Sequence, residues 1–524
     1  MNQILPNKPS ATGSRIEKTT RNFIVGIIYQ ILLLLLNFIS RTIFIKVLGV
    51  EYLGINGLFA NILSVLSMAD LGIGTAIMYS LYKPLARKDK TIIAALISYY
   101  KKIYIVIASA VAIIGISLVP FLQYIVNLDK SLPNIKIYYI LFLLNSVVSY
   151  LFVYKTILIS ADQKNYLLKI YNMAFAVIKF VAQIFVLYAT HNYILFLVIM
   201  VLSTLSNNYF CSIKTEKIYP YLKLLKTELD KTYKKTVFVN IKSVFLYRFG
   251  GIILNNTDNI IISILVGTVA VGYYSNYFLL ITAILGFTNI IISSVMASVG
   301  NLVVDNNLEY KYKIFNILSL LCFWVFGFSS ICLFILFQDF ISLWLGSDYL
   351  LSNIAVIIII INFYMPGLLN PIWIFRDTTG LFKKTKYITI VTSIINIVLS
   401  VLLGMRYGLT GVLGATILAR GMTNFWYEPY ILHKDYFRKP VVKYFLQLLI
   451  RTILLCATAG LLYYITNFFN ISSVQNFIIK LFLCIIVING IFFIVFRKMD
   501  EFIYLKEYFL KSIIRNLKTK IMKK

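Results

Sequence analysis

Residues 22–54 read NFIVGIIYQILLLLLNFISRTIFIKVLGVEYLG. The first part of this stretch is almost wholly apolar, and about 20 such residues suffice for a helix to cross the hydrocarbon layer of a membrane. Similar stretches recur along all 524 residues, of which 60% are hydrophobic and only 13% are charged. Because soluble domains rarely carry so little charge, the sequence predicts an all-α polytopic membrane protein.

The apolar stretches predict fourteen transmembrane helices. Their expected bounds are 22–45, 54–82, 91–119, 135–159, 166–188, 192–212, 239–265, 273–300, 314–337, 353–375, 387–404, 411–432, 442–465 and 475–496. Of the 50 Lys and Arg residues, 40 lie in the termini and in the loops on the same side of these helices. Lys and Arg are retained in the cytoplasm during insertion, so both termini are predicted to be cytoplasmic.

An internal repeat divides the chain. Gly49 and Gly54, in the turn after the first span, match Gly267 and Gly272 after the seventh at an offset of 218 residues. Six spans separate the copies, so they run in the same direction, as in transporters built from parallel repeats. The predicted organisation is a cytoplasmic N-terminal segment (1–21), an N-terminal six-helix bundle (22–212), a cytoplasmic linker (213–238), a C-terminal six-helix bundle (239–432), helices 13 and 14 (433–496) and a basic amphipathic cytoplasmic tail (497–524).

Polar side chains inside the spans are the candidate functional residues. An ionisable group there costs about 2.5–3.5 kcal/mol, so it is expected to face a cavity or a partner. The candidates for substrate binding are Gln30, Asn37, Arg41, Lys179, Arg248, Asn255 and Arg420, and those for ion coupling are Asp70 and Asp258. In the first span, Gln30, Asn37 and Arg41 share one helix face, and the 218-residue offset places Arg248, Asn255 and Asn259 on the matching face of the seventh.

Structural roles for these residues stay open. Arg41 and Arg248 lie where each side chain could extend to the nearer membrane surface, and Asp70 could bond a neighbouring amide or hydroxyl. Basic residues outnumber acidic ones within the spans, so a cavity that they line would attract an anion. Arginine suits phosphate in particular. The prolines Pro366 and Pro371 predict a kink in the tenth span, either static or a hinge for alternating access.

Several function classes are disfavoured. The net charge of +30 lies in short loops, where it controls topology, so no nucleic-acid partner is expected. No G-x-x-x-x-G-K-[ST] motif indicates ATP hydrolysis, and no loop is long and acidic enough for the sugar chemistry of a membrane glycosyltransferase. With two histidines far apart and no C-x-x-C pair, neither a metal site nor a cofactor is expected, and we predict a non-enzyme.

Three motifs carry a resemblance to a known family. They are RTIFIKVLGVEYLG from Arg41, DLGIGTAIMYSLYKPLA from Asp70 and RDTTGLFKK from Arg376. With the order of the spans, they make the chain similar to the polysaccharide-specific branch of the multidrug/oligosaccharidyl-lipid/polysaccharide (MOP) exporter superfamily, the flippases of O-antigen and capsule repeat units. The resemblance implies two six-helix bundles in a V, a cationic central cavity and two further C-terminal helices that form a groove for a lipid tail. It carries family arginines over to Arg41 and Arg376, which adds Arg376 to the substrate-binding candidates.

The resemblance also implies a function. The chain is expected to move an undecaprenyl-diphosphate-type lipid-linked oligosaccharide from the inner to the outer leaflet of a bacterial cytoplasmic membrane. Expected partners are membrane lipids, a polysaccharide polymerase and export machinery. The alternative is a cation-coupled multidrug or small-solute antiporter of the same fold, and neither the glycan nor a coupling ion follows from the sequence.

Overall fold

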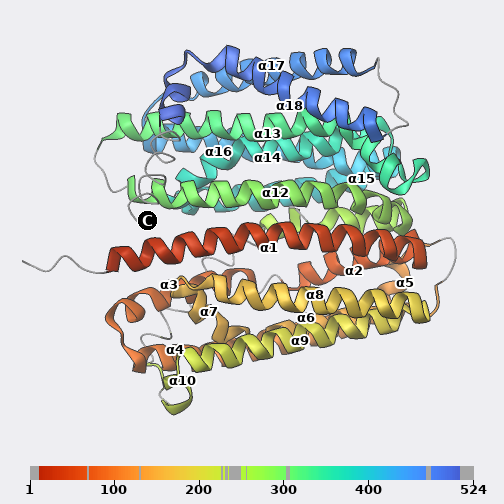
Figure 1. Ribbon diagram of the computed structural model, residues 1–524, viewed down its shortest axis with the longest axis vertical. Helices are drawn as coiled ribbons and strands as arrows, with labels where there is room; N and C mark the ends of the chain where they lie inside the picture. Colours follow the sequence, from red (N-terminus) through yellow and green to blue (C-terminus); the bar gives the residue numbers. More distant parts are fainter. Residues whose placement is uncertain are drawn as a thin grey trace, which may run out of the picture. The chain divides into compact units, whose positions relative to one another are not determined.

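The computed structural model describes residues 11–67, 70–128, 132–225, 228–230, 234, 250–254, 256–302, 307–379, 381–467 and 474–507. Within these ranges the chain is helical and contains no strand (Figure 1). The chain divides into two compact units, Met1–Ser275 and Asn276–Lys524. This division lies inside one helix, α12, and not in the predicted linker, so the predicted domain bounds stay a prediction.

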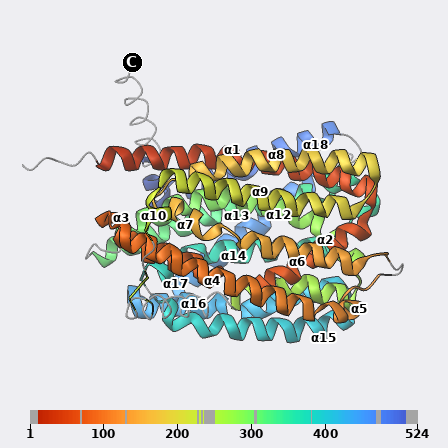
Figure 2. The same ribbon diagram turned by 90° about the horizontal axis from the view of Figure 1, so that it is seen from below.

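The first unit is a bundle of long helices. They are α1 (Ala11–Leu48), α2 (Val50–Leu66), α3 (Asp70–Arg87), α4 (Lys90–Ser117), α6 (Ile135–Tyr150), α7 (Val153–Ala161), α8 (Asn165–Thr190) and α9 (Tyr193–Ile218), with short turns η2 (Val119–Phe121), α5 (Leu122–Ile125) and α10 (Tyr221–Leu224). Both views show α1 beside α8 and α8 beside α9 (Figures 1 and 2). Unlabelled helical turns at 250–254 and 256–265 precede α12 (Thr268–Leu302).

Side-chain caps begin several helices. The Asp89 carboxylate accepts from the backbone N–H of Ile92 at 3.0 Å and starts α4. The amide oxygen of Asn192 accepts from the N–H of Ile194 at 2.8 Å and starts α9. Such caps satisfy N–H groups that have no partner inside the helix, which matters most where little water is available.

The repeated glycines meet where α2 packs against the start of α12. Gly49 and Gly267 have φ values of 93° and 127°, a backbone region that favours glycine. Gly54 and Gly272 are helical, but a Cβ on Gly54 would lie 2.1 Å from the carbonyl oxygen of Thr268, and one on Gly272 would lie 2.8 Å from that of Val50. The contact is reciprocal under the 218-residue offset, because Gly54 approaches the residue that follows Gly267 and Gly272 approaches the residue that follows Gly49.

A break interrupts the predicted fourth span. It ends α6 at Tyr150 and starts α7 at Val153, with a bend of 49° between the two helices. Phe152 has a φ of 71°, which is costly for a residue with a side chain. Its ring packs edge-on against Tyr209 of α9, with ring centroids 5.7 Å apart, and this contact holds the strained turn.

The second unit contains the rest of the helices. They are α13 (Leu308–Leu345), η3 (Ser347–Tyr349), α14 (Asn353–Thr379), α15 (Phe382–Met422), α16 (Asn424–Leu432), η4 (His433–Phe437), α17 (Val442–Thr466) and α18 (Val474–Phe496). The helix α13 packs against α14, α17 and α18 (Figure 1). An aromatic cluster that includes Phe315, Phe375 and Phe437 is fully buried among these helices.

Helix α14 runs through both of its prolines. Pro371 has no N–H to donate to the carbonyl of Gly367, four residues earlier. The side-chain amide of Asn370 donates to that carbonyl at 3.2 Å and to the carbonyl of Pro366 at the same distance. Substitute donors of this kind let a helix tolerate proline inside a membrane.

The segment α15 is two antiparallel helices folded at Gly408. Gly408 has φ 58° and ψ −136°, which no α-helix contains. A Cβ on Gly411 would lie 2.0 Å from the carbonyl oxygen of Leu403, and Asn396 donates to Thr416 at 2.9 Å. The chain therefore reverses between 404 and 411, where the sequence predicts a loop between two spans.

The structure confirms the all-α membrane fold. Ten described helices are long and apolar enough to cross a membrane, or eleven if α6 and α7 form one bent span. That count treats 387–437 as one span, although this stretch contains the hairpin at Gly408. The predicted span 239–265 lies partly outside the described residues, and 54–82 is divided between α2 and α3. The total of fourteen therefore stays a prediction.

Candidate functional site

The polar residues on one face of α1 differ in how deeply they are buried. In the structure, Gln30 is half-buried and Asn37 is exposed. Arg41 is half-buried, and its Nη1 donates to the Ser275 hydroxyl of α12 at 2.8 Å. Ser275 in turn donates to the carbonyl of Gly272 at 2.8 Å. Arg41 is therefore connected to the glycine contact between α2 and α12.

Helix α8 carries a second polar face. Asn172 accepts a bond from Asn207 of α9 at 2.9 Å, and Gln183 donates to the Phe196 carbonyl at 3.1 Å. Lys179, between them on the same face, is half-buried and has no hydrogen bond or ion pair to any described residue. The two amides thus join α8 to α9, and Lys179 remains available for an anion.

A ladder of neutral polar contacts follows α9. Thr204 donates to the Asn145 side chain at 2.7 Å, and Asn208 donates to the Ser149 carbonyl at 3.0 Å. These bonds join α9 to α6 and extend the polar interior of the first unit. The candidates predicted from the sequence are charged residues and their polar neighbours, and they include no residue of α9. Its repeated small polar residues at helical spacing were the available signal.

In the second unit, Arg376 is buried in an ion cluster. Its Nη1 donates to Oε1 of Glu428 at 2.7 Å, and its Nε donates to Asp377 at 3.0 Å. The indole N–H of Trp373 donates to the other oxygen of Glu428 at 2.7 Å. Arg376 is 6% exposed and Glu428 only 1%. This arrangement joins α14 to α16 and restrains the arginine that sequence reasoning assigned to substrate.

The sequence prediction had missed Glu428. Its place in an otherwise apolar stretch, directly before Pro429, was the available signal, because a carboxylate in a span requires a partner. Arg420, the other basic candidate of this unit, is half-buried in the last turn of α15. None of the described contacts joins Arg420 to Arg376.

An apolar groove lies between α13, α14 and α17. Its volume is about 350 Å³, and its lining includes Phe334, Ile357 and Gly460. Of the lining surface, almost none is polar. Toward the start of α17, the same three helices enclose a small second cavity beside Ser319, Tyr444 and Arg451. The groove and this small cavity share no lining residue, so the groove is apolar and the cavity is a separate, partly polar one.

Arg451 lines the small cavity. Its side chain is 8% exposed, and its Nη2 has no hydrogen-bond partner among the described residues. The hydroxyl of Tyr444 is likewise buried without a described partner. A buried guanidinium with an unfilled donor favours an anionic or water ligand. Arg451 belongs to α17, outside the two predicted six-helix bundles.

Several predicted residues cannot be placed. Arg248 and Asn255 lie outside the described residues, as does the side chain of Asp70 at the start of α3. Asp258 is half-buried in the helical segment 256–265. The ion-coupling role of Asp70 and Asp258 and the substrate contacts of Arg248 and Asn255 therefore stay predictions, as do those of the other candidates.

Comparison with known proteins gives structural likenesses only. No protein-family model and no curated protein sequence matches the chain. Among solved structures, the lipid II flippase MurJ in an inward closed conformation matches with a TM-score of 0.66 and 13% identity, over 92% of this chain and 99% of that one.

Two multidrug transporters also match. An inward-facing multidrug resistance MATE family transporter of the MOP superfamily has a TM-score of 0.57 and 13% identity, over 79% of this chain and 98% of that one. A mutant form of the Vibrio cholerae MATE transporter VcmN has a TM-score of 0.59 and 12% identity, over 83% of this chain and 99% of that one. The chain thus shares the helical fold of MOP-superfamily membrane transporters.

Proposed function

We propose that the protein is a non-enzymatic transporter that flips a polyprenyl-diphosphate-linked oligosaccharide from the inner to the outer leaflet by alternating access. The cargo would be a repeat unit of O-antigen, capsule or exopolysaccharide. The protein would work in a bacterial cytoplasmic membrane with both termini inside. Its partners would include membrane lipids, a polysaccharide polymerase and export machinery.

The groove of the second unit carries this proposal. A polyprenyl diphosphate has a long apolar chain joined to an anionic group. The groove offers about 350 Å³ of apolar space for the chain, and the same three helices hold Arg451, with an unfilled donor, in a separate small cavity. In water, apolar burial contributes about 25 cal/mol per Å² of surface removed from the solvent. Inside a bilayer this contribution is largely lost, because lipid chains are as apolar as the groove, and close packing is the main source of affinity. An apolar groove of this kind favours a cargo with a long apolar chain over a compact polar solute.

Cations of the first unit support an anionic headgroup. Lys179 is half-buried and without a described partner, and Arg41 reaches the start of α12. Arginine and lysine both bind phosphate, the former as a planar fork and the latter as a point charge. We therefore assign Arg41 and Lys179, with Gln30 and Asn37, to the headgroup and its sugars.

The alternative is a cation-coupled antiporter for drugs or small solutes. The likeness to MATE transporters favours it, and Asp258 would then bind the coupling ion. The two functions differ in the sign of the cargo. A half-buried lysine such as Lys179 would repel a cationic drug and attract an anionic cargo, which supports the flippase.

Deletion of the gene followed by lipid analysis tests the proposal. We expect lipid-linked repeat units to accumulate in the inner leaflet, where an impermeant sugar-directed label does not reach them. Increased drug sensitivity without such accumulation would favour the antiporter. When the Gly460→Leu variant is expressed in the deletion strain, we expect no export, because the leucine fills the groove. A Cβ at Gly460 meets nothing within 4 Å, so the side chain enters open space.

Gly490→Leu is the matched control. Gly490 is also helical, has nothing within 4 Å of a Cβ and does not line the groove. Wild-type export by the Gly490 variant, with equal amounts of both variants in the membrane, would assign the loss to the groove. Normal export by Gly460→Leu would mean that the lipid chain passes elsewhere.

A further inference from the structure

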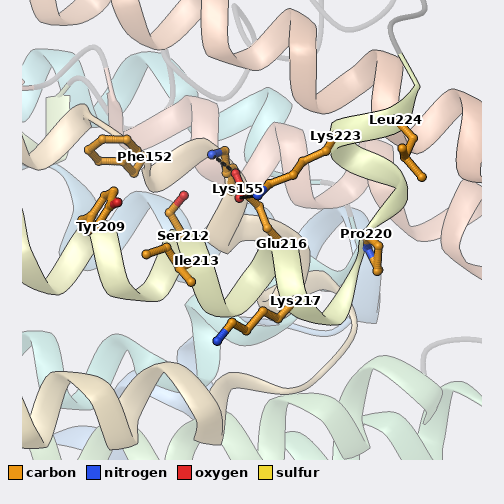
Figure 3. Close-up of a pocket in the computed structure, with 10 residues that line it drawn as sticks. All are labelled: Phe152, Lys155, Tyr209, Ser212, Ile213, Glu216, Lys217, Pro220, Lys223 and Leu224. Atoms are coloured by element: carbon orange, nitrogen blue, oxygen red, sulfur yellow. Dashed lines mark hydrogen bonds and ion pairs between the residues drawn. The ribbon is translucent and has the colours of Figure 1, made fainter.

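A further pocket lies in the first unit, and none of its lining residues belongs to α1 or α8. It has a volume of about 640 Å³ and is enclosed by the start of α7, the last turns of α9 and α10 (Figure 3). All of these segments are at the end of the bundle that is predicted to be cytoplasmic. The function proposed above does not use this pocket.

The pocket has a positive charge. Lys155 and Lys223 converge on Glu216, the latter at 2.9 Å (Figure 3). Lys217 also lines the pocket, is exposed, and forms no ion pair with a described residue. Three ammonium groups and one carboxylate leave a net charge of +2 on the lining. Because Glu216 is already neutralised by two lysines, an anion would meet the remaining positive charge.

Two further donors face the pocket. Ser212 is only 2% exposed, yet its hydroxyl forms no hydrogen bond with a described residue. In Figure 3 this hydroxyl is turned toward the side where Phe152 and Lys155 lie. The first turn of α7 has no side-chain cap, so backbone N–H groups and the positive end of the helix dipole also lie beside Phe152. A buried hydroxyl and an uncapped helix start complement phosphate oxygens.

The rim of the pocket is apolar. The ring of Tyr209 is 49% exposed, and Leu224, next to Lys223, is 79% exposed. Phe152 forms part of the inner wall. Apolar and aromatic groups beside lysines are typical of the membrane interface, where acyl chains and headgroups meet. A free phosphate ion would gain nothing from this rim, whereas a lipid would contact it with its acyl chains.

We propose that this pocket binds the phosphate of an anionic phospholipid of the inner leaflet. Lys155, Lys217 and Lys223 hold the charge, Ser212 and the start of α7 donate to the phosphate oxygens, and the lipid chains lie against Tyr209 and Leu224. The bound lipid fills the gap at the break between α6 and α7. None of the residues assigned above to cargo binding lines this pocket.

Native mass spectrometry of the purified full-length protein tests this assignment. The probes are phosphatidylglycerol, phosphatidylcholine and inorganic phosphate, each titrated separately and in competition. We expect saturable binding of phosphatidylglycerol and weaker binding of phosphatidylcholine. A lysine near an anionic membrane surface contributes about a five-fold change in affinity, so Lys217→Gln should weaken binding by roughly that factor.

The controls decide between outcomes. Lys214→Gln removes the same charge from α9 outside the pocket and should leave the affinity within about two-fold of wild type. Ser212→Ala should weaken binding without loss of charge, and thermal unfolding checks that each variant folds. Equal losses in the Lys214 and Lys217 variants would overturn the site, because the effect would then be general electrostatics. Full displacement of the lipid by millimolar phosphate would overturn the lipid assignment in favour of a soluble ion.

Discussion

Replacing Gly54 by alanine tests the contact between the two repeat copies. The added Cβ would lie 2.1 Å from the Thr268 carbonyl oxygen, whereas ordinary contacts begin at 3.4 Å. The backbones must therefore separate by more than 1 Å, since neither atom belongs to a flexible side chain. Overpacking costs typically about 1–3 kcal/mol, and alanine recovers about 1 kcal/mol through its higher helix propensity. We expect Gly54→Ala to lower the free energy of unfolding by up to about 2 kcal/mol.

Thermal unfolding in detergent, followed by intrinsic fluorescence at one scan rate, measures this change. Gly272→Ala should have a smaller effect, because its Cβ would lie 2.8 Å from the Val50 carbonyl. Gly460→Ala is the control, since its Cβ meets nothing within 4 Å and should raise the stability slightly. If Gly54→Ala unfolds at or above the temperature of the Gly460 variant, the close contact between α2 and α12 does not exist.

Three other substitutions probe buried charge and backbone strain, each measured by the same unfolding assay. Glu428→Leu should destabilise the protein by about 3–5 kcal/mol, because it removes the buried carboxylate that pairs with the Arg376 guanidinium. The other described ion pair of Arg376 is with Asp377, whose carboxylate is more exposed than that of Glu428. A double variant with Arg376→Met should recover most of this loss, and no recovery would mean that the pair is not coupled. Lys480→Met should cost a similar amount by isolating Asp339, its buried partner at 2.8 Å. His191→Gly should stabilise the protein by roughly 1 kcal/mol, because His191 is exposed at a φ of 53°. An unchanged or lower stability would argue against a left-handed residue at the end of α8.

The all-α membrane class could be predicted from the sequence. Hydropathy is a local property, and a segment of about 20 apolar residues has few alternatives to a membrane-spanning helix. The sequence predicted the chain reversal at Gly408 but not the break in the fourth span. The first was predicted from a polar interval between two spans, whereas the second was missed because Phe152 gives no turn signal in the sequence.

The candidate site could be predicted only in part. Sequence position indicated that Arg41 and Lys179 lie within the bundle, because a charge in an apolar span is conspicuous. It could not indicate that Arg376 pairs with Glu428, since the two residues are 52 positions apart and on different helices. Pair contacts of this kind depend on how helices rotate and pack, and helix periodicity alone does not specify the rotation.

The sequence by itself determined the all-α class, the presence of apolar segments long enough to span a membrane, and the offset of 218 residues between the two pairs of glycines. Only the tertiary structure decided why the glycines recur. Gly49 and Gly267 allow a left-handed turn, whereas Gly54 and Gly272 allow two backbones to touch. The physical reason is that a glycine's backbone angle is set locally, but the space that its missing Cβ leaves has meaning only when another segment occupies it.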